Sequence, residues 1–219
     1  MRSSSRSPKS PCSPAWGFSP HTTIFAGRLQ SLVVYAPAAS GAPTPTLAVV
    51  DRLTAEDLRA CAGRAGAWHD HELSTPLLLE AGEFARSLDA FPLEFGAILA
   101  DHAVVSGANP FEGCRVDPAD LRRACEVQAR SHLLHLREGF VETEGRGDAI
   151  AALILRSAAP LAALLNSVRR LSAANHDDPV LTRISRLSAS SPLPSDEARR
   201  LFPAYLTALE ALTQRIDQW

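Results

Sequence analysis

The chain is short of lysine and of aromatic residues. Lysine occurs once, at Lys9, among 22 basic residues, which removes most lysine chemistry, including Schiff bases and the phosphate-loop lysine. Aromatic residues make up 6% of the 219 residues, so the core has to be built from Ala, Leu and Val. With 24 acidic residues the formal net charge is −2, which excludes a globally basic nucleic-acid binder but leaves room for a local basic groove.

Paired cysteines and long apolar runs are missing as well. The four cysteines lie far apart and form no Cys-x-x-Cys pair, which argues against a zinc knuckle or a thioredoxin-type site (Cys12, Cys61, Cys114 and Cys125). The most apolar segment, residues 149–165, is interrupted by Arg156 and Pro160. It is expected to be too short and too broken to span a membrane, and the cytoplasm is the expected location.

Composition divides the chain into three parts. Residues 1–20 are rich in Ser and Pro and lack the apolar run of a secretory signal, so they are predicted to be a disordered tail. Residues 21–113 alternate short apolar runs with turn residues, which is typical of a small α/β domain. Residues 114–219 carry only helical signals and are predicted to form an antiparallel helical bundle, so the predicted class is α+β.

The α/β part contains four candidate strands and several helices. The strands are expected at residues 31–35, 47–50, 73–79 and 102–107, and Pro76 favours an edge or strand-start position for the third. Thr54 is predicted to cap a helix that runs to Ala62, with Leu58 and Cys61 facing inward. Residues 80–88 look helical, and residues 91–98 remain open between a turn and a short helix.

Each helix of the C-terminal part has a start signal. Asp117 before Pro118 opens the first, Asp148 is expected to cap a central helix kinked at Pro160, and Asp178 and Ser195 open the last two. In the last helix five apolar residues form one stripe that is typical of core packing (Phe202, Leu206, Leu209, Leu212 and Ile216).

The α/β part resembles the polymerase-β-like nucleotidyltransferase superfamily. The resemblance rests on the strand and small-residue loop of residues 31–41, the strand 47–50, the helix entry 51–59 and the strand and turn 102–111. It implies a small mixed-sheet nucleotidyltransferase-like domain with an appended helical bundle. An active member transfers a nucleoside monophosphate with the help of Mg²⁺.

The loop departs from the family pattern at its most important positions. The family has a Gly-Ser pair that approaches the triphosphate, and this chain has Ala36 and Pro37 there. Proline has no N–H to donate and alanine has no hydroxyl. Ser40 and Gly41 are what remains of the nucleotide loop.

The Asp-x-Asp pair of the family is also absent. Two such residues on a strand face the same way and hold Mg²⁺ together. Here the corresponding positions are Pro43 and Pro45, or Thr44 and Thr46 in the other register, and no carboxylate occurs in residues 35–50. The remaining metal candidates are Asp51, expected at the far end of the strand, and Glu80, which could mimic the third carboxylate of the family.

These departures predict a catalytically degenerate nucleotidyltransferase-like protein that acts as a binding or interaction module. No catalytic residue and no cofactor are expected. Two alternatives stay open: an active Mg²⁺-dependent nucleotidyltransferase with displaced carboxylates, and a structural or oligomerising helical protein. A protein partner or a second copy is expected on the helical domain, no membrane partner is expected, and nucleotide binding is left open.

Three further groups of residues invite a functional reading. His69 and His71 offer two metal ligands, but the sequence places no third nearby, so a solvated loop is the favoured interpretation. His132 and His135 are expected as a buried or interfacial pair on one helix. Arg130 and Arg137 share a helical face that is predicted to be a solvated charged surface.

Overall fold

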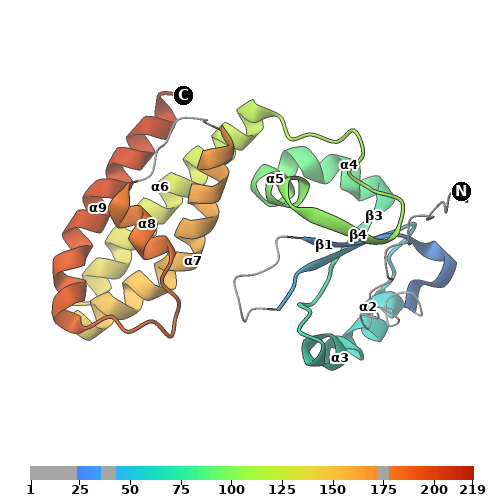
Figure 1. The fold of residues 1–219 in the computed structure, drawn as a ribbon, viewed down its shortest axis with the longest axis horizontal. Helices are drawn as coiled ribbons and strands as arrows, with labels where there is room; N and C mark the ends of the chain where they lie inside the picture. The colour runs from blue at the N-terminus through green and yellow to red at the C-terminus, as the bar shows by residue number, and fades with distance from the viewer. Residues whose placement is uncertain (1–23, 36–42, 172–177) are drawn as a thin grey trace, which may run out of the picture. The chain divides into compact units, whose positions relative to one another are not determined.

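The computed structural model describes residues 24–35, 43–171 and 178–219 (Figure 1). The tail predicted over residues 1–20 and the loop residues Ser40 and Gly41 lie outside the described residues. The α+β class is confirmed, because a small mixed sheet is followed by a C-terminal region of long helices.

Four strands form the sheet in the order β3-β2-β1-β4. They are β1 (Leu29–Tyr35), β2 (Thr46–Val50), β3 (Leu77–Glu80) and β4 (His102–Gly107). Strands β1 and β2 are antiparallel, and β2 and β3 are parallel, so the sheet is mixed. All five residues of β2 are buried, which agrees with an uninterrupted apolar run at the centre of a sheet.

The third strand is shorter than predicted. It begins at Leu77, directly after Pro76, and Leu73 makes only an isolated bridge to Thr44. Since proline cannot donate to a strand ladder, it marks the start of the pairing. The edge position that Pro76 predicted for this strand is confirmed.

Helix α2 (Ala55–Ala62) begins at the predicted cap. The Thr54 hydroxyl accepts from the Asp57 amide at 3.2 Å, and the Asp57 carboxylate accepts from the Thr54 amide at 2.9 Å. Cys61 is buried as expected, but Leu58 is 49% exposed, so its inward orientation was wrong. The buried side of this helix is instead the one that carries Asp57 and Cys61.

Three further α-helices follow in the first half of the chain: α3 (Ala65–Asp70), α4 (Ala81–Ala90) and α5 (Pro92–Ala100). The segment left open between a turn and a helix is therefore helical, with Pro92 at its first turn. Helix α4 begins one residue later than predicted, because Glu80 still belongs to β3.

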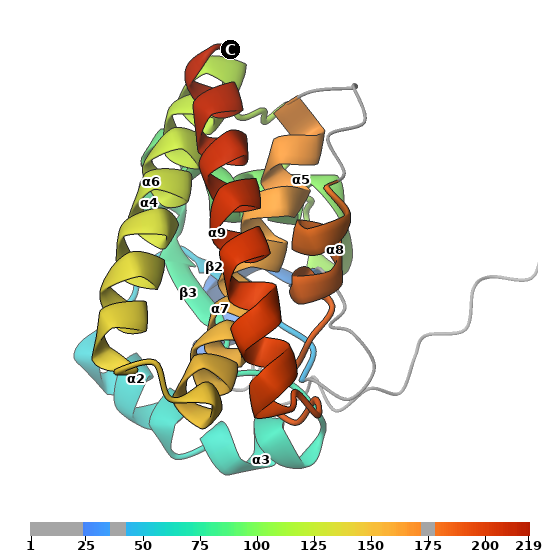
Figure 2. The same cartoon turned by 90° about the vertical axis from the view of Figure 1, so that its left-hand side faces the viewer.

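The long helices are α6 (Pro118–Glu142), α7 (Gly147–Leu171) and α9 (Ser195–Asp217), with the short α8 (Pro179–Ser185) before the last (Figures 1 and 2). Helix α7 contacts the other three, as expected of the central helix. The predicted stripe of α9 is confirmed, since Phe202, Leu209, Leu212 and Ile216 are buried and Leu206 packs against the same core.

Side-chain caps open two of these helices as predicted. Asp117 accepts from the Ala119 amide at 2.8 Å, and Asp178 accepts from the Val180 amide at 2.8 Å. The cap predicted at Asp148 was wrong. The Arg146 carbonyl already accepts the first helical bond of α7, so Asp148 lies inside the first turn, where its charge still complements the helix dipole.

Helix α7 continues through Pro160 and is 25 residues long. The expectation that this apolar segment is too short to span a membrane was therefore wrong. Among the described residues it is the one helix that is long and apolar enough to cross a membrane. This is weak evidence, because a buried core helix has the same properties. Ile154, Leu161 and Val168 of this helix lie in the bundle core.

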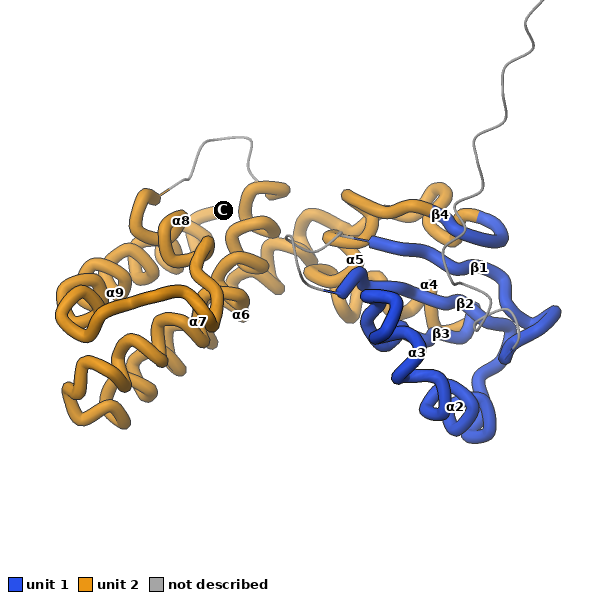
Figure 3. The backbone as a smooth tube through the Cα atoms, turned by 60° about the horizontal axis from the view of Figure 1, so that its bottom comes forward, with its two compact units in different colours: residues 1–81, 104–108 blue, residues 82–103, 109–219 orange. Residues whose placement is uncertain are grey.

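The chain divides into two compact units (Figure 3). One comprises residues 1–81 and 104–108, and the other residues 82–103 and 109–219. This division differs from the predicted boundary between residues 113 and 114, because α4 and α5 belong with the bundle and α5 contacts α6 and α7.

An ion pair between Arg28 and Asp57 connects the residue before β1 to α2. Asp57 receives two hydrogen bonds from the Arg28 guanidinium, at 2.6 and 2.9 Å, and these together with the Thr54 contacts hold the pKa of the Asp57 carboxyl well below its usual range. The charged form of Asp57 is therefore stabilised by folding. Its contribution is present above about pH 4 and is lost as the pH falls through the lower pKa of the folded state.

The variant Asp57→Asn should lose less unfolding free energy than the wild type between about pH 5 and about pH 3, because it lacks this titrating group. Urea denaturation followed by tryptophan fluorescence measures the difference. The exposed neighbour Glu56→Gln is the matched control and should keep the wild-type pH dependence. An unchanged pH dependence in Asp57→Asn would contradict the role of this ion pair.

Candidate functional site

The sheet brings together the two metal candidates, at the end of β2 that lies away from Thr44 and Thr46. Val50, the last residue of β2, pairs with Glu80 of β3, so Asp51 and Glu80 lie at one edge of the sheet. At the opposite end of β2 the Tyr35 amide donates to the Pro45 carbonyl at 3.1 Å. At about 3.3 Å per residue, Thr46 and Asp51 are roughly 16 Å apart along the strand.

Both acids are engaged in local hydrogen bonds. The Gln30 amide donates to Asp51, and the Leu53 backbone amide donates to Glu80 at 2.7 Å. Each carboxylate thus fastens the end of β2 to its surroundings. Residues 24–35, 43–171 and 178–219 contain no group of three or more His, Cys, Asp or Glu side chains arranged to hold a metal ion.

At the Thr46 end of β2 the described residues offer no carboxylate as a metal ligand. Thr46, one of the positions that the resemblance assigns to the acidic pair, is 1% exposed and its hydroxyl has no hydrogen-bond partner among the described residues. Thr44 forms a backbone bridge with Leu73. A neutral, buried residue of this kind cannot replace a carboxylate as a Mg²⁺ ligand.

The histidines near residue 70 are exposed and lie at the end of a helix, so the predicted loop was wrong for His69. His69 is in α3 and its ring is 3.5 Å from the Thr75 hydroxyl, while His71 follows the helix end. This pair offers no enclosed site.

The arginine face of α6 is paired with acids on α9. Arg130 contacts Asp217 at 2.7 Å and Arg137 contacts Glu210 at 2.6 Å, and Arg130 also contacts Glu126 on its own helix. These exposed pairs neutralise the face, as the interpretation as a solvated charged surface requires. They leave little net positive charge to attract a polyanion.

The most unusual polar group of the bundle is centred on His132. Its Nε2 lies 2.6 Å from the Tyr205 hydroxyl, which lies 3.1 Å from the Ser157 hydroxyl. Three helices, α6, α9 and α7, each contribute one of these residues. His135, predicted to share the buried or interfacial environment of His132, lies one turn further along the same side of α6 but is exposed, and its ring contacts Glu138.

The directions of these hydrogen bonds assign the protons. Ser157 donates its single proton to the Ile154 carbonyl at 2.8 Å, so its oxygen accepts from Tyr205. Tyr205 has then used its own proton and must accept from His132. The chain therefore runs from His132 Nε2–H through both hydroxyls, which leaves the Nδ1 of a neutral His132 with a free lone pair.

Burial sets the ionisation states that this arrangement needs. Burial, with a smaller contribution from His135, lowers the pKa of His132, so the neutral imidazole is favoured. Burial also raises the pKa of Tyr205 to about 12, so the phenol keeps its proton. The three hydrogen-bonded side chains inside the bundle are therefore all uncharged.

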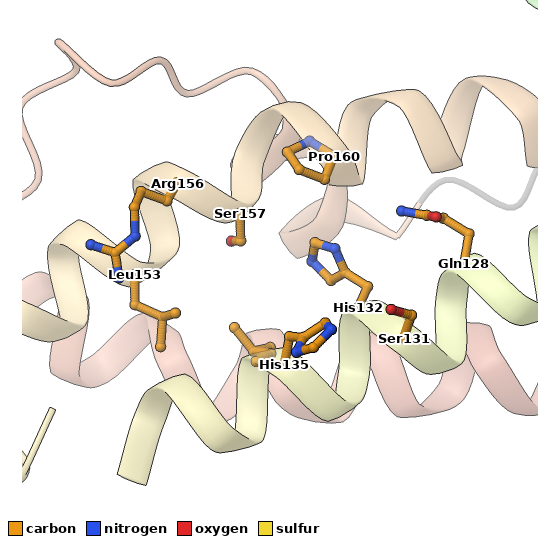
Figure 4. Close-up of a pocket in the computed structure, with 9 residues that line it drawn as sticks. Gln128, Ser131, His132, His135, Leu153, Arg156, Ser157 and Pro160 are labelled. Atoms are coloured by element: carbon orange, nitrogen blue, oxygen red, sulfur yellow. The ribbon is translucent and has the colours of Figure 1, made fainter. Parts of the chain in front are cut away.

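A pocket of about 310 Å³ lies between α6 and α7, beside these hydrogen-bonded side chains (Figure 4). The His132 ring projects into it from α6 toward Ser157 and Pro160 of α7. The lining comes from one face of each helix (Gln128, Ser131, His132, His135 and Leu136 of α6; Leu153, Arg156, Ser157 and Pro160 of α7). A close approach of the two helices borders this region, because a Cβ at Gly139 would lie 2.7 Å from the Leu153 side chain.

Tyr205 and Ser157 were missed by the sequence reasoning. A signal was available for Tyr205, which lies three residues after Phe202 and four before Leu209, within the buried stripe of α9. A tyrosine inside such a stripe needs a hydrogen-bond partner. The partner itself is 73 positions away in the sequence, so the pattern alone cannot name it.

No protein-family model and no curated protein matches the chain. What can be said of function therefore depends on the geometry of these residues.

Removing the Tyr205 hydroxyl should destabilise the bundle. In Tyr205→Phe the buried His132 Nε2–H loses its acceptor, which should lower the free energy of unfolding by about 1–3 kcal/mol. Urea denaturation followed by far-UV circular dichroism measures it. The matched control is Tyr35→Phe, whose hydroxyl has no hydrogen-bond partner among the described residues, and it should change stability much less. Equal losses of unfolding free energy in the two variants would refute a special role for the hydrogen bonds of Tyr205.

Proposed function

We propose that this chain is a nucleotidyltransferase-like protein without metal-dependent nucleotidyl transfer, which works in the cytoplasm as a binding or interaction module. The observation that carries the proposal is the position of Asp51 and Glu80. They lie at the end of β2 opposite Thr46, one of the positions that the resemblance assigns to the acidic pair, and both accept local hydrogen bonds.

The chemistry of the family explains why this position matters. In two-metal phosphoryl transfer the ions lie about 3.5–4 Å apart and stabilise the attacking and leaving oxygens. Their carboxylate ligands must therefore converge beside the loop that holds the phosphates. With neutral residues at Thr44 and Thr46, the metal-based stabilisation that provides most of the catalysis is lost.

Calorimetry with Mg²⁺ and each nucleoside triphosphate tests the proposal. We expect no saturable binding that requires Mg²⁺ and no release of pyrophosphate, because the acidic pair is missing. Pyrophosphate release that disappears in the double variant Asp51→Asn, Glu80→Gln would establish the active alternative with displaced carboxylates. The single variant Asp101→Asn, an exposed acid outside this sheet edge, is the control for a general loss of charge.

A second candidate function, self-association through the helical unit, is favoured by an apolar seam on α6. Val127, Leu134 and Val141 are 63%, 62% and 75% exposed and lie seven residues apart. Apolar residues at this spacing form one stripe along a helix and are typical of a helix–helix seam.

The sequence of α6 suits a second copy of the same helix in antiparallel orientation. When two copies cross at Leu134, residues at equal distances on either side face each other, so Val127 faces Val141 of the second copy. At the flanking positions Arg130 faces Glu138 of the second copy, which pairs opposite charges. The seam is therefore complementary to itself.

Sedimentation equilibrium over a series of concentrations tests this pairing. The wild type should form a dimer, and Leu134→Glu should shift it to a monomer, because a charge at the centre of the seam has to be desolvated. The control Leu58→Glu introduces the same change at an exposed leucine of α2 and should leave the dimer intact. A wild type that stays monomeric at every concentration would sink the idea.

A further inference from the structure

Arg156 is a cation of the pocket lining, and the part of the chain that the structure describes offers it no acidic partner. Arg130 and Arg137 of the same bundle pair with acids, but no carboxylate among the described residues contacts Arg156. Its neighbours one turn away on α7 are Ala152, Leu153, Ala159 and Pro160, so its own helix supplies no counter-charge. An exposed guanidinium beside a pocket is available to an anion from solution.

The same pocket presents hydrogen-bond acceptors. His132 is 9% exposed, and the direction of its hydrogen bonds leaves the Nδ1 lone pair without a donor among the described residues. Pro160 has no N–H, so the carbonyl of Arg156 lacks the amide that would normally bond to it in a helix. Both acceptors belong to residues that line the pocket (Figure 4).

We propose that this pocket binds a small organic oxyanion that also carries a hydroxyl or N–H group. The anionic group pairs with the Arg156 guanidinium, and the hydroxyl or N–H group donates to Nδ1 of His132. The Ser131 hydroxyl and the Gln128 amide line the same space and add polar contacts. A volume of about 310 Å³ is at the lower end for ligand pockets, which favours a compact ligand.

The combination of groups selects the ligand class. A neutral molecule leaves Arg156 without a counter-charge, and an anion that has no O–H or N–H group, such as sulfate, leaves the Nδ1 of His132 without a donor. Only a molecule with both groups satisfies both ends of the pocket. This proposal uses residues of the helical unit alone and does not depend on the nucleotidyltransferase resemblance.

Three probes with a common three-carbon body test it: glycerol 3-phosphate, glycerate and glycerol. Titration of the full chain, followed by the histidine ring resonances in NMR spectra, should show saturable shifts of His132 and His135 with an anion and none with glycerol. The anion that binds more tightly identifies a phosphate or a carboxylate as the preferred group. No saturable shift with either anion, or equal shifts with glycerol, would overturn the proposal.

Variants of Arg156 locate the binding. Arg156→Gln should weaken binding of the preferred anion at least about tenfold, and Arg156→Lys should restore part of it, because the charge returns without the planar fork. Arg156 is exposed, so both variants should fold. The control Arg186→Gln removes the same charge outside the pocket and should leave the affinity unchanged. An equal loss in Arg186→Gln would mean that the anion responds only to overall charge, and would refute the site.

Discussion

The arrangement of the helical unit depends on the need to satisfy polar groups that it buries. His132, Tyr205 and Ser157 come from three different helices. His132 donates to the Tyr205 hydroxyl, which donates to the Ser157 hydroxyl. Leaving a buried polar group unpaired costs more free energy than a typical hydrogen bond contributes. The hydrogen bonds among these three residues therefore favour one packing arrangement of α6, α7 and α9. They also fix the proton on Nε2 of His132, and with it the acceptor at the pocket.

The two units use their charged residues differently. In the sheet unit, Asp51, Asp57 and Glu80 all accept hydrogen bonds from residues close by in the fold and hold the ends of β1 and β2 in place. None of them is free to converge on a metal ion. In the helical unit, Arg156 lies beside a pocket and has no counter-charge among the described residues, so the observations that bear on ligand binding come from the bundle and not from the sheet.

Local signals in the sequence predicted much of the fold. Contacts between residues far apart in the sequence could not be predicted in this way. Thr54, Asp117 and Asp178 marked helix starts because capping involves residues two or three positions away. The cap predicted at Asp148 was wrong by two residues, because the first helical bond of α7 is accepted by Arg146. Leu58 faces out because Asp57, paired with Arg28, shares the buried side of α2 with Cys61. His132 and His135 were both expected to be buried or interfacial, whereas only His132 is buried, and its partner on α9 is set by packing that no periodicity encodes.

The state of the His132 ring is the point on which the account of the bundle and its pocket rests. Nitrogen-15 chemical shifts of the histidine rings distinguish the two neutral tautomers and the imidazolium. At about pH 7 we predict a neutral His132 with its proton on Nε2, hydrogen-bonded to Tyr205. A proton on Nδ1, or a doubly protonated ring, would contradict the direction of the chain and remove the acceptor from the pocket.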